Sequence, residues 1–381
     1  MKVYIYQFFF LFALLCCSCT QHNKNQIHND FTNLVNLDEE HVTSIYDWFS
    51  EVEIIPIETN EESVMGYPIT KMLVDNGQFY FSTHKGNAIW QFDSNGRFIK
   101  KINYYGAGPH EYSDLSDFRF NRFTGDLEIL CTWGYINVYE HSGDVFKKRI
   151  SFDKKYINVL HNFIELSQDK YLLFSASREG NKMLWYDVAN NNIIAEDYNL
   201  PEFLFFNTPY HHTYSPFYVF NDTVHFVQAA DGEVFTIDTI GNLNPKYNFD
   251  FGKYNFDIST LEEESVEFYV RHSRSIGAKY ANRFLAYGEN SSYYISRFSF
   301  RKGIQHLLMN KKDNSIITFG RTKEKCLFMP VCVDENFLYY FASPQELQVA
   351  INPDILSNEE RDKFNSITPD DNLVVIRCKF K

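Results

Sequence analysis

A short motif that recurs along the chain constrains its fold more than any other feature of the sequence. Each copy is an aromatic or aliphatic run that ends on an acidic residue and is followed by spacers and a turn former. The clear copies are WQFDSNG at 90–96, VYEHSG at 138–143, LWYDVAN at 184–190 and FTIDTIG at 235–241, and LMNKKD at 308–313 is a weaker fifth. A strand-forming run that meets turn-forming residues predicts a β-hairpin at each copy.

The spacing of the copies predicts the architecture. The acidic residue advances from Asp93 to Glu140, Asp187 and Asp238, in steps of 47, 47 and 51 residues. Repeats of about 40–50 residues are typical of β-propeller blades. The next step, to Asn310, is 72 residues, which indicates an insertion. We therefore expect an all-β chain that folds as a single six-bladed β-propeller with four-stranded antiparallel blades.

Alternation with a period of two residues places six blades along the chain. They are expected at about 69–104, 117–152, 162–200, 217–251, 283–319 and 327–380. The sixth blade has a C-terminal strand at 373–378 but no strand after it. The N-terminal segment 52–58 is expected to supply the missing strand, because pairing of the two chain ends removes an open sheet edge. Pro56 lacks an amide hydrogen, so this strand must be the outermost one.

Two polar segments interrupt the strand pattern and predict short helical insertions. STLE at 259–262 and SNEE at 357–360 both have the spacing of a capping box. The first predicts a helix to about residue 280, between blades four and five, and the second a helix to about residue 364, inside blade six.

The N-terminus predicts a lipid anchor. An apolar stretch at 3–15 follows Lys2 and leads directly into the sequence CCSC at 16–19. Residues 1–18 therefore look like a bacterial lipoprotein signal, with Cys19 as the acylated residue and Cys17 as the alternative. The polar residues that follow predict a flexible tether over 19–49, and the propeller is expected over 50–381.

Charge and cysteine content limit the function classes. The formal net charge is −13, and no run of Lys or Arg supplies the basic surface that nucleic acid requires, so a nucleic-acid partner is excluded. Cys131, Cys326, Cys332 and Cys378 form no CxxC pair, so we expect no zinc site, and no metal or cofactor is expected elsewhere. The sequence leaves open whether Cys332 and Cys378 pair in the last blade.

The segment YGAGPHEY at 105–112, between blades one and two, resembles a family signature. It is similar to the Gly-x-Gly-Pro-Gly-Glu-Tyr motif of the six-bladed β-propeller lipoproteins of Bacteroides and relatives, which are themselves similar to NHL-repeat propellers. The matching residues are Gly106, Gly108, Pro109, Glu111 and Tyr112, and His110 replaces the usual Gly. From their chemistry, Glu111 and Tyr112 are expected to lock the crossover between the blades by hydrogen bonding.

The resemblance covers nearly the whole mature chain and implies a cellular location. Such proteins are anchored in the cell envelope by lipid at the outer membrane and are generally without an assigned enzymatic activity. Surface-export tags in these bacteria tend to carry acidic residues just after the lipidated Cys. Residues 20–25 have none, which favours the periplasmic side.

Propeller topology predicts where a ligand would bind. In a four-stranded blade, the loops from the second to the third strand and the crossovers between blades lie on one face, here called the crossover face. The hairpin turns lie on the opposite hairpin face. Because loops on a rigid scaffold concentrate binding residues, we expect a ligand on the crossover face. The candidate ligand-binding residues are His84, Trp133, Arg178, His211, His212 and Arg301.

Two classes of function compete. The leading hypothesis is a lipid-anchored, non-enzymatic propeller that binds a carbohydrate, a peptide or an envelope protein, and a structural part in an outer-membrane complex is not separable from it by sequence. The alternative is a propeller enzyme, such as a metal-dependent lactonase or lyase, with its site at the mouth of the central channel. That chemistry needs carboxylates or histidines that converge on the axis, and the candidates on the innermost strands are Asp75, Asp117 and Glu165.

Two Asp-Thr-aliphatic triplets resemble the O-glycosylation acceptor pattern of Bacteroidetes. They lie at 238–240 and 222–224, so Thr239 and Thr223 are candidate acceptors. Thr239 falls at the expected tip of a hairpin, where an acceptor would be accessible.

Overall fold

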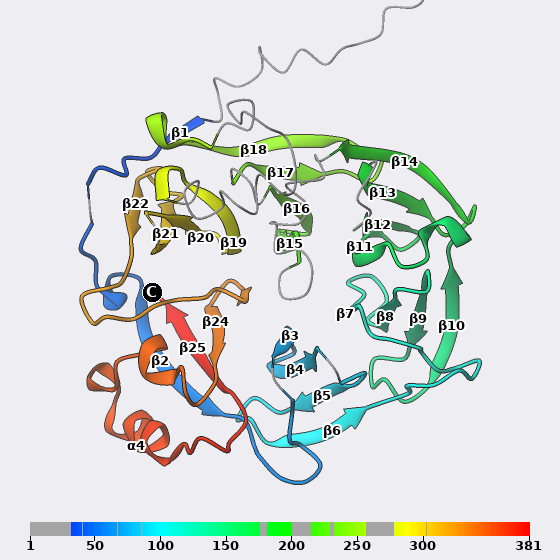
Figure 1. Cartoon of the computed structure of the whole chain (residues 1–381), viewed down its shortest axis with the longest axis horizontal. Helices are drawn as coiled ribbons and strands as arrows, with labels where there is room; N and C mark the ends of the chain where they lie inside the picture. The colour runs from blue at the N-terminus through cyan, green and yellow to red at the C-terminus, as the bar shows by residue number, and fades with distance from the viewer. Residues whose placement is uncertain are drawn as a thin grey trace, which may run out of the picture.

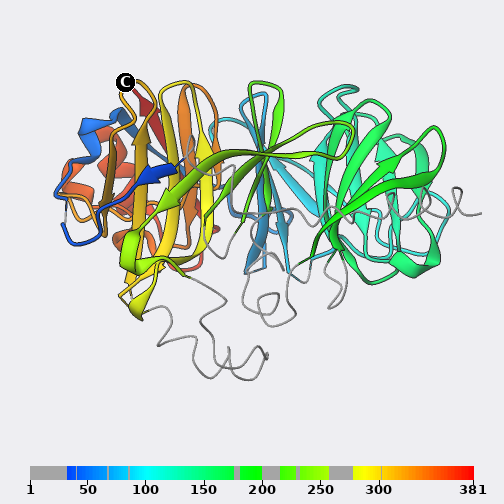
Figure 2. The same cartoon turned by 90° about the horizontal axis from the view of Figure 1, so that it is seen from above.

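The chain forms a ring of six β-sheets around a central axis (Figure 1), and the ring seen from its side carries loops on both faces (Figure 2). The computed structural model describes residues 32–39, 41–66, 68–84, 86–175, 181–199, 215–228, 232–256, 278–301 and 303–381. The six-bladed β-propeller that the repeat predicts is confirmed.

Each blade contains four antiparallel strands in sequence order from the axis outward, except that the last blade takes its outer strand from the N-terminal part of the chain. Blade one comprises β3 (Ile69–Asp75), β4 (Gln78–Thr83), β5 (Ile89–Phe92) and β6 (Phe98–Ile102), and blade two β7 (Asp117–Phe120), β8 (Leu127–Cys131), β9 (Tyr135–Tyr139) and β10 (Phe146–Ser151). Blade three comprises β11 (Leu160–Ser167), β12 (Lys170–Ser175), β13 (Asn181–Asp187) and β14 (Asn192–Asn199), and blade four β15 (Phe217–Phe220), β16 (Thr223–Val227), β17 (Val234–Ile237) and β18 (Leu243–Asp250). Blade five comprises β19 (Asn282–Glu289), β20 (Tyr293–Phe300), β21 (Gly303–Asn310) and β22 (Ile316–Phe319), and blade six β23 (Cys332–Val333), β24 (Phe337–Ala342), β25 (Val374–Phe380) and β2 (Phe49–Pro56).

The ring is closed by pairing of the two ends of the chain, as the sequence predicted. Strand β2 pairs antiparallel with β25, with Val52 opposite Cys378 and Pro56 opposite Val374. Figure 1 shows the blue β2 beside the red β25 in the same blade. Because β2 is the edge strand, Pro56 needs no partner on its outer side.

In the first copy of the repeat, the acidic residue caps the hairpin turn. Asp93 Oδ1 accepts hydrogen bonds from the amides of Asn95 at 2.8 Å and Arg97 at 2.9 Å. Gly96 has φ of 81°, and a Cβ on it would lie 2.3 Å from the carbonyl oxygen of Pro56. Both the left-handed backbone and the close approach therefore require glycine here. The repeat thus encodes turns rather than ligand contacts.

Hydrophobic side chains fill the interfaces between adjacent blades. The described residues form six buried clusters, and each spans one of the six interfaces around the ring. Large aromatics supply much of this packing, including the fully buried Tyr80, Phe81, Tyr139 and Trp185. The high aromatic content of the chain is therefore explained by packing between sheets.

Residues 32–39 and 41–48, which we call the strap, run along the outside of blade five. Strand β1 (Thr32–Leu34) adds to β18 of blade four in parallel orientation. Val35 and Leu37 are buried against blades four and five, and Trp48 packs on Phe319 with ring centroids 4.9 Å apart. The strap lies within the segment 19–49 that was predicted as a flexible tether. Its few apolar residues, scattered in a polar stretch, anchor it to the ring.

The helical segments with described bounds are short, and three of these six lie in blade six. Helix α4 (Asn358–Ser366) begins after Ser357, whose hydroxyl accepts the amide of Glu360 at 3.2 Å, as the capping pattern predicted. The chain also contains α3 (Leu347–Ala350) and the 3-10 turns η1 (Ile45–Asp47), η2 (Lys154–Tyr156), η3 (Gly252–Tyr254) and η5 (Pro353–Ile355). The helix predicted at 259–280 falls almost entirely outside the described residues. In the described ranges, no helix has the length and apolar character to cross a bilayer.

The four cysteines of the described chain are free thiols. Cys332 on β23 and Cys378 on β25 are separated by the intervening strand β24. Two strand spacings amount to about 9–10 Å, which exceeds the Cα separation that a disulfide allows. These two residues therefore do not pair.

Candidate functional site

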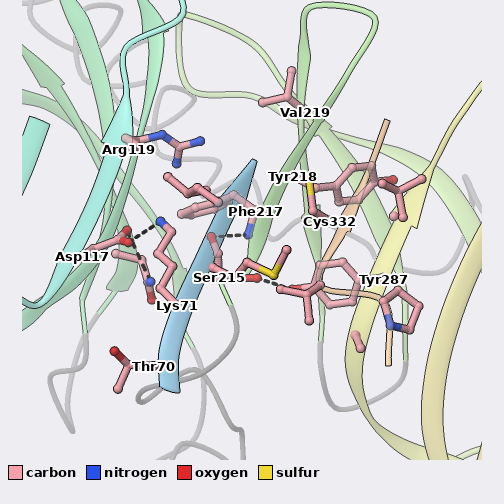
Figure 3. Close-up of a pocket in the computed structure, with 18 of the residues that line it drawn as sticks. Thr70, Lys71, Asp117, Arg119, Ser215, Phe217, Tyr218, Val219, Tyr287 and Cys332 are labelled. Carbon is pink, nitrogen blue, oxygen red and sulfur yellow. Dashed lines mark hydrogen bonds and ion pairs between the residues drawn. The ribbon is translucent and has the colours of Figure 1, made fainter. Parts of the chain in front are cut away.

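A cavity of about 280 Å³ occupies the centre of the ring (Figure 3). The innermost strands of all six blades contribute to its wall. Blades one to three supply a mainly polar side with Thr70, Lys71, Met72, Leu73, Ser116, Asp117, Arg119, His161 and Asn162. Blades four to six supply a mainly apolar side with Ser215, Phe217, Tyr218, Val219, Leu285, Ala286, Tyr287, Gly288, Pro330, Val331, Cys332 and Val333. The cavity is therefore amphipathic.

The polar side is built around an ion pair between blades one and two. Lys71 Nζ donates to Asp117 Oδ1 at 2.5 Å, as the dashed line in Figure 3 shows. Asp117 Oδ2 accepts the backbone amide of Phe163 from blade three at 3.2 Å. Asp117 thus ties three blades together at the axis. Burial lowers the pKa of Lys71, and the adjacent Asp117 carboxylate opposes that shift.

A second ionic group lies deeper along the same side. Glu165 on β11 lies 3.0 Å from Arg119 through Oε2 and 3.0 Å from Arg122 through Oε1. Arg119 Nη1 also donates to the carbonyl oxygen of Phe163 at 2.6 Å. One carboxylate therefore holds two guanidinium groups, and only Arg119 of the two lines the cavity.

Arg122 ties the blades together toward the hairpin face. Its Nη1 donates to the carbonyl oxygen of Asp222 in blade four at 3.0 Å, and its Nη2 donates to that of Glu165 in blade three at 2.8 Å. The cavity-lining residues of blades two, three and four lie near the start of the innermost strand of each blade. These strands begin on the crossover face. The cavity therefore lies toward the crossover face, on the side that the sequence predicted for a ligand.

The apolar side is held in place by tyrosine hydrogen bonds. Tyr287 donates to the carbonyl oxygen of Ser215 at 2.7 Å, and Tyr218 donates to Glu289 Oε1 at 2.8 Å. The ring of Phe217 lies between the two sides of the cavity in Figure 3. These contacts fix an aromatic surface opposite the ionic groups.

Each of the three carboxylates that the enzyme hypothesis named has a basic partner. Asp117 and Glu165 are each engaged by cations, and Asp75 lies at the hairpin end of β3, 3.3 Å from His141 Nε2. Among the residues whose structure is described, no three His, Cys, Asp or Glu side chains gather closely enough to hold a metal ion.

The three predicted ligand residues that the structure describes lie in crossover-face loops but outside the cavity wall. His84 is exposed between β4 and β5, and Trp133 is 56% exposed between β8 and β9. Arg301, between β20 and β21, donates to the Tyr254 hydroxyl at 3.1 Å and lies 3.5 Å from Asp38, so it holds the strap. Arg178, His211 and His212 lie outside the described residues.

The YGAGPHEY segment forms a tight structural loop. Glu111 Oε2 accepts the amide of Gly108 at 2.7 Å, and a Cβ on Gly106 would lie 1.9 Å from the same oxygen. The fully buried Tyr112 donates to the carbonyl oxygen of Asn87 at 2.8 Å. His110 is not among the described residues with positive φ, and its ring stacks on Phe146 with centroids 4.6 Å apart. The exchange of Gly for His is therefore accommodated without backbone strain.

The two candidate acceptor threonines lie on the hairpin face. Thr239 is exposed in the turn between β17 and β18, and Thr223 is partly buried at the start of β16. Of the two, Thr239 presents the more accessible hydroxyl.

Comparison of the sequence with models of known protein families assigns this propeller to a family. Residues 31–379 match the model of DUF4934, described as a domain of unknown function. The chain belongs to the DUF4934 family. No curated protein matches it.

Solved structures share the fold of this DUF4934 chain at low sequence identity. A presumed exported protein of Bacteroides fragilis has a TM-score of 0.71 and 13% identity, covering 92% of this chain and 99% of that one. Virginiamycin B lyase of Staphylococcus aureus has a TM-score of 0.39 and 12% identity, covering 74% and 76%. BamB of Moraxella catarrhalis has a TM-score of 0.36 and 9% identity, covering 76% and 70%.

Of the carboxylates named from sequence, only Asp117 lines the cavity of this DUF4934 chain, and sequence reasoning missed the cations Lys71 and Arg119. Lys71 and Arg119 lie in short strands whose alternation is otherwise apolar, at ITKMLVD and DFRF. A charged residue inside the innermost strand of a blade was the available signal, because such a residue must find a partner near the axis.

Proposed function

We propose that this protein is a non-enzymatic binding module of the cell envelope that takes its ligand into the central cavity from the crossover face. The observation that carries the proposal is the amphipathic wall, with mainly polar groups on blades one to three and mainly apolar groups on blades four to six. Concave sites that combine apolar lining with a few placed polar groups are typical of ligand pockets. The ligand class is a carbohydrate, a peptide or an exposed group of an envelope protein.

The state of the carboxylates supports binding over catalysis. A general base or a metal ligand needs a carboxylate that is free to take a proton or a cation. Asp117 is ion-paired with Lys71, and Glu165 with Arg119 and Arg122. The inner carboxylates of the described ring therefore serve to position cations.

An envelope location is supported from two directions. The structural neighbour from Bacteroides fragilis is a presumed exported protein. The leader that ends in Ser18-Cys19 supports attachment by lipid, and the resemblance to NHL-like propeller lipoproteins supports the outer membrane. We place the protein on the periplasmic side.

A matched pair of substitutions tests the site. Ser116 lines the cavity and Ser142 is exposed at a hairpin tip, so Ser116→Trp fills the cavity while Ser142→Trp leaves it open. Glycan and peptide panels are screened by calorimetry against the wild type and both variants, after circular dichroism has shown that they fold. Ser116→Trp is expected to lower the affinity for the ligand by at least about tenfold, and Ser142→Trp is expected to leave the affinity unchanged. Equal binding by the two variants would exclude the cavity as the site.

A further inference from the structure

In the cavity wall, the cationic side chains are more exposed than the carboxylates that pair with them. The side chains of Lys71 and Arg119 are 17% and 13% exposed, whereas those of their partners Asp117 and Glu165 are 1% and 0% exposed. The cations therefore face the cavity, and the carboxylates lie behind them. A ligand meets N–H donors on this side rather than carboxylate oxygens.

Both cations retain donors for a ligand. The ammonium group of Lys71 has three N–H bonds and, among the residues that the structure describes, makes one side-chain hydrogen bond, to Asp117. The guanidinium of Arg119 has five, of which Nη1 bonds to Phe163 and Nε faces Glu165. In Figure 3, Arg119 extends from its strand on the same side of the cavity as the pair formed by Lys71 and Asp117. An acceptor with two oxygens suits such a pair of cationic donors.

An unused acceptor lies beside these donors. Asn162 lines the cavity, and its Oδ1 is buried without a hydrogen-bond donor among the described residues. Its Nδ2 lies 3.5 Å from Asp117 Oδ2, which directs the amide toward the same ionic group. A buried acceptor left unpaired costs about 1–3 kcal/mol, so a ligand hydroxyl or N–H group that donates to Oδ1 gains from that contact.

The volume limits what can enter. A cavity of about 280 Å³ is at the small end of ligand pockets, which span about 300–1,000 Å³. It fits one sugar ring or one amino-acid residue. The apolar side with Phe217 and Tyr287 would cover the less polar face of such a group.

From this arrangement we propose that the cavity recognises a carboxylate on its ligand, bound by Lys71 and Arg119, with a hydroxyl or an N–H group beside it that donates to Asn162. The inference rests on the proposed binding function and names the chemistry of its ligand. Two sources carry this chemistry, an acidic sugar such as a uronic acid and an amino acid or the C-terminal residue of a peptide.

Four probes test whether the carboxylate is required for binding. They also distinguish an acidic sugar from an amino acid or peptide end as its source. Glucuronate is compared with glucose, and N-acetylphenylalanine with its amide, by calorimetry on the folded chain at ligand concentrations up to about 10 mM. We expect binding of a carboxylate probe and at least about tenfold weaker binding of its uncharged counterpart. The probe that binds identifies the source. Failure of both carboxylates to bind would overturn the inference.

Substitutions in the wall test the roles of the two cations. Arg119→Gln is the milder change, because Glu165 keeps Arg122 as its partner. This variant is expected to bind the carboxylate probe about tenfold more weakly than the wild type does. Asp117→Asn leaves Lys71 in place without its counter-charge and is expected to retain or tighten binding. The double variant Lys71→Met/Asp117→Asn removes the cation without burying a lone carboxylate and is expected to lose binding. Lys100→Met, which removes a cation paired with Asp144 outside the cavity, is the control.

The outcomes distinguish this inference from the proposed function. If the ligand found by screening is uncharged, is lost in Ser116→Trp and is held within about twofold by Arg119→Gln, carboxylate recognition is wrong while the cavity remains the binding site. If Ser116→Trp leaves every ligand bound, the proposed function itself is wrong.

Discussion

Two buried side chains, Glu128 and His225, are driven toward their neutral forms and affect stability in opposite pH directions. Burial raises the pKa of Glu128 to about 7, although Oε1 accepts hydrogen bonds from Tyr171 and Asn121. Its Oε2 has no hydrogen-bond partner among the described residues. Burial, reinforced by Lys246, lowers the pKa of His225 to about 4. Each group titrates differently in the unfolded chain, so each links folding to pH.

For Glu128 the folded pKa is raised, so the folded chain binds the extra proton between about pH 4.5 and pH 7. Stability is therefore lost as the pH rises through that window. Glu128→Gln mimics the neutral form and is expected to gain stability relative to the wild type, by about 2 kcal/mol more at pH 8 than at pH 5. Urea unfolding at the two pH values measures this, with exposed Glu140→Gln as the matched control. A gain that is equal at both pH values would contradict the assignment.

For His225 the folded pKa is lowered, so the unfolded chain binds the extra proton between about pH 6.5 and pH 4. Lys246 can only donate, at 2.7 Å to Nε2, so the neutral ring carries its proton on Nδ1 and donates to the carbonyl oxygen of Thr223. Stability is expected to fall by about 1–2 kcal/mol from this residue as the pH drops from 7.5 to 5. His225→Gln should show a smaller fall in the same unfolding experiment. The control is His84→Gln, in an exposed loop, and its free energy of unfolding should decrease over this pH range as that of the wild type does.

At the scale of elements, the strap and β2 hold the ring shut by different means. The strap pairs β1 with β18 and buries Val35, Leu37 and Trp48, whereas β2 completes the sheet of blade six and is covered by α4 through the bond from Ile54 to Glu360. Loss of the strap exposes apolar surface but leaves all six blades whole. Loss of β2 leaves β25 as an open edge, which invites aggregation.

A truncation series separates these contributions. A chain that begins at residue 32 is expected to melt as the full mature chain does, and one that begins at residue 49 to melt at least about 5 °C lower, because burial of a large apolar side chain contributes about 1.5–3 kcal/mol. A chain that begins at residue 59 is expected to lose cooperative unfolding. Differential scanning calorimetry measures all three. Equal melting of the chains that begin at 32 and 49 would show that the strap does not stabilise the ring.

The blades were predictable from sequence because local chemistry encodes them. Asp93 and Gly96 specify their turn regardless of the rest of the molecule, and Pro56 marks its strand as an edge. The strap was not predictable, because isolated residues such as Val35 and Leu37 carry no periodicity. The cavity was predictable only in its position. Lys71 and Asp117 are 46 positions apart, and only the closed ring brings them together.

At the scale of the whole molecule, the net charge and the cavity have opposite effects on negatively charged ligands. The chain carries a formal charge of −13, which disfavours acidic polymers at its surface. Surface charges are screened over about 8 Å at physiological ionic strength, so a small ligand inside the cavity responds mainly to Lys71 and Arg119. A polyanion is thus repelled, while a single carboxylate that enters the ring is bound. The proposed ligand is therefore a small group or a chain end.

The anchor would set how the ring meets the membrane. Residues 20–31 separate Cys19 from the strap, and even a fully extended segment of that length spans at most about 45 Å. Because the strap is fixed to the outer edge of blade four, an acyl group on Cys19 would keep that edge within this distance of the bilayer. The tether would therefore limit how far blade four lies from the bilayer, and it would leave the orientation of the two faces of the ring free.

We therefore expect Cys19→Ala to move the protein from the membrane to the soluble fraction, and Cys17→Ala to leave it attached. Intact-mass measurement should show loss of the acyl groups in the first variant alone. Because residues 20–25 carry no acidic residue, protease added to intact cells is expected to leave the wild type uncut, as for a protein on the periplasmic side. Release by Cys17→Ala would move the acylated position to that residue. Digestion on intact cells would place the ring on the outer surface, where its ligand would come from outside the cell.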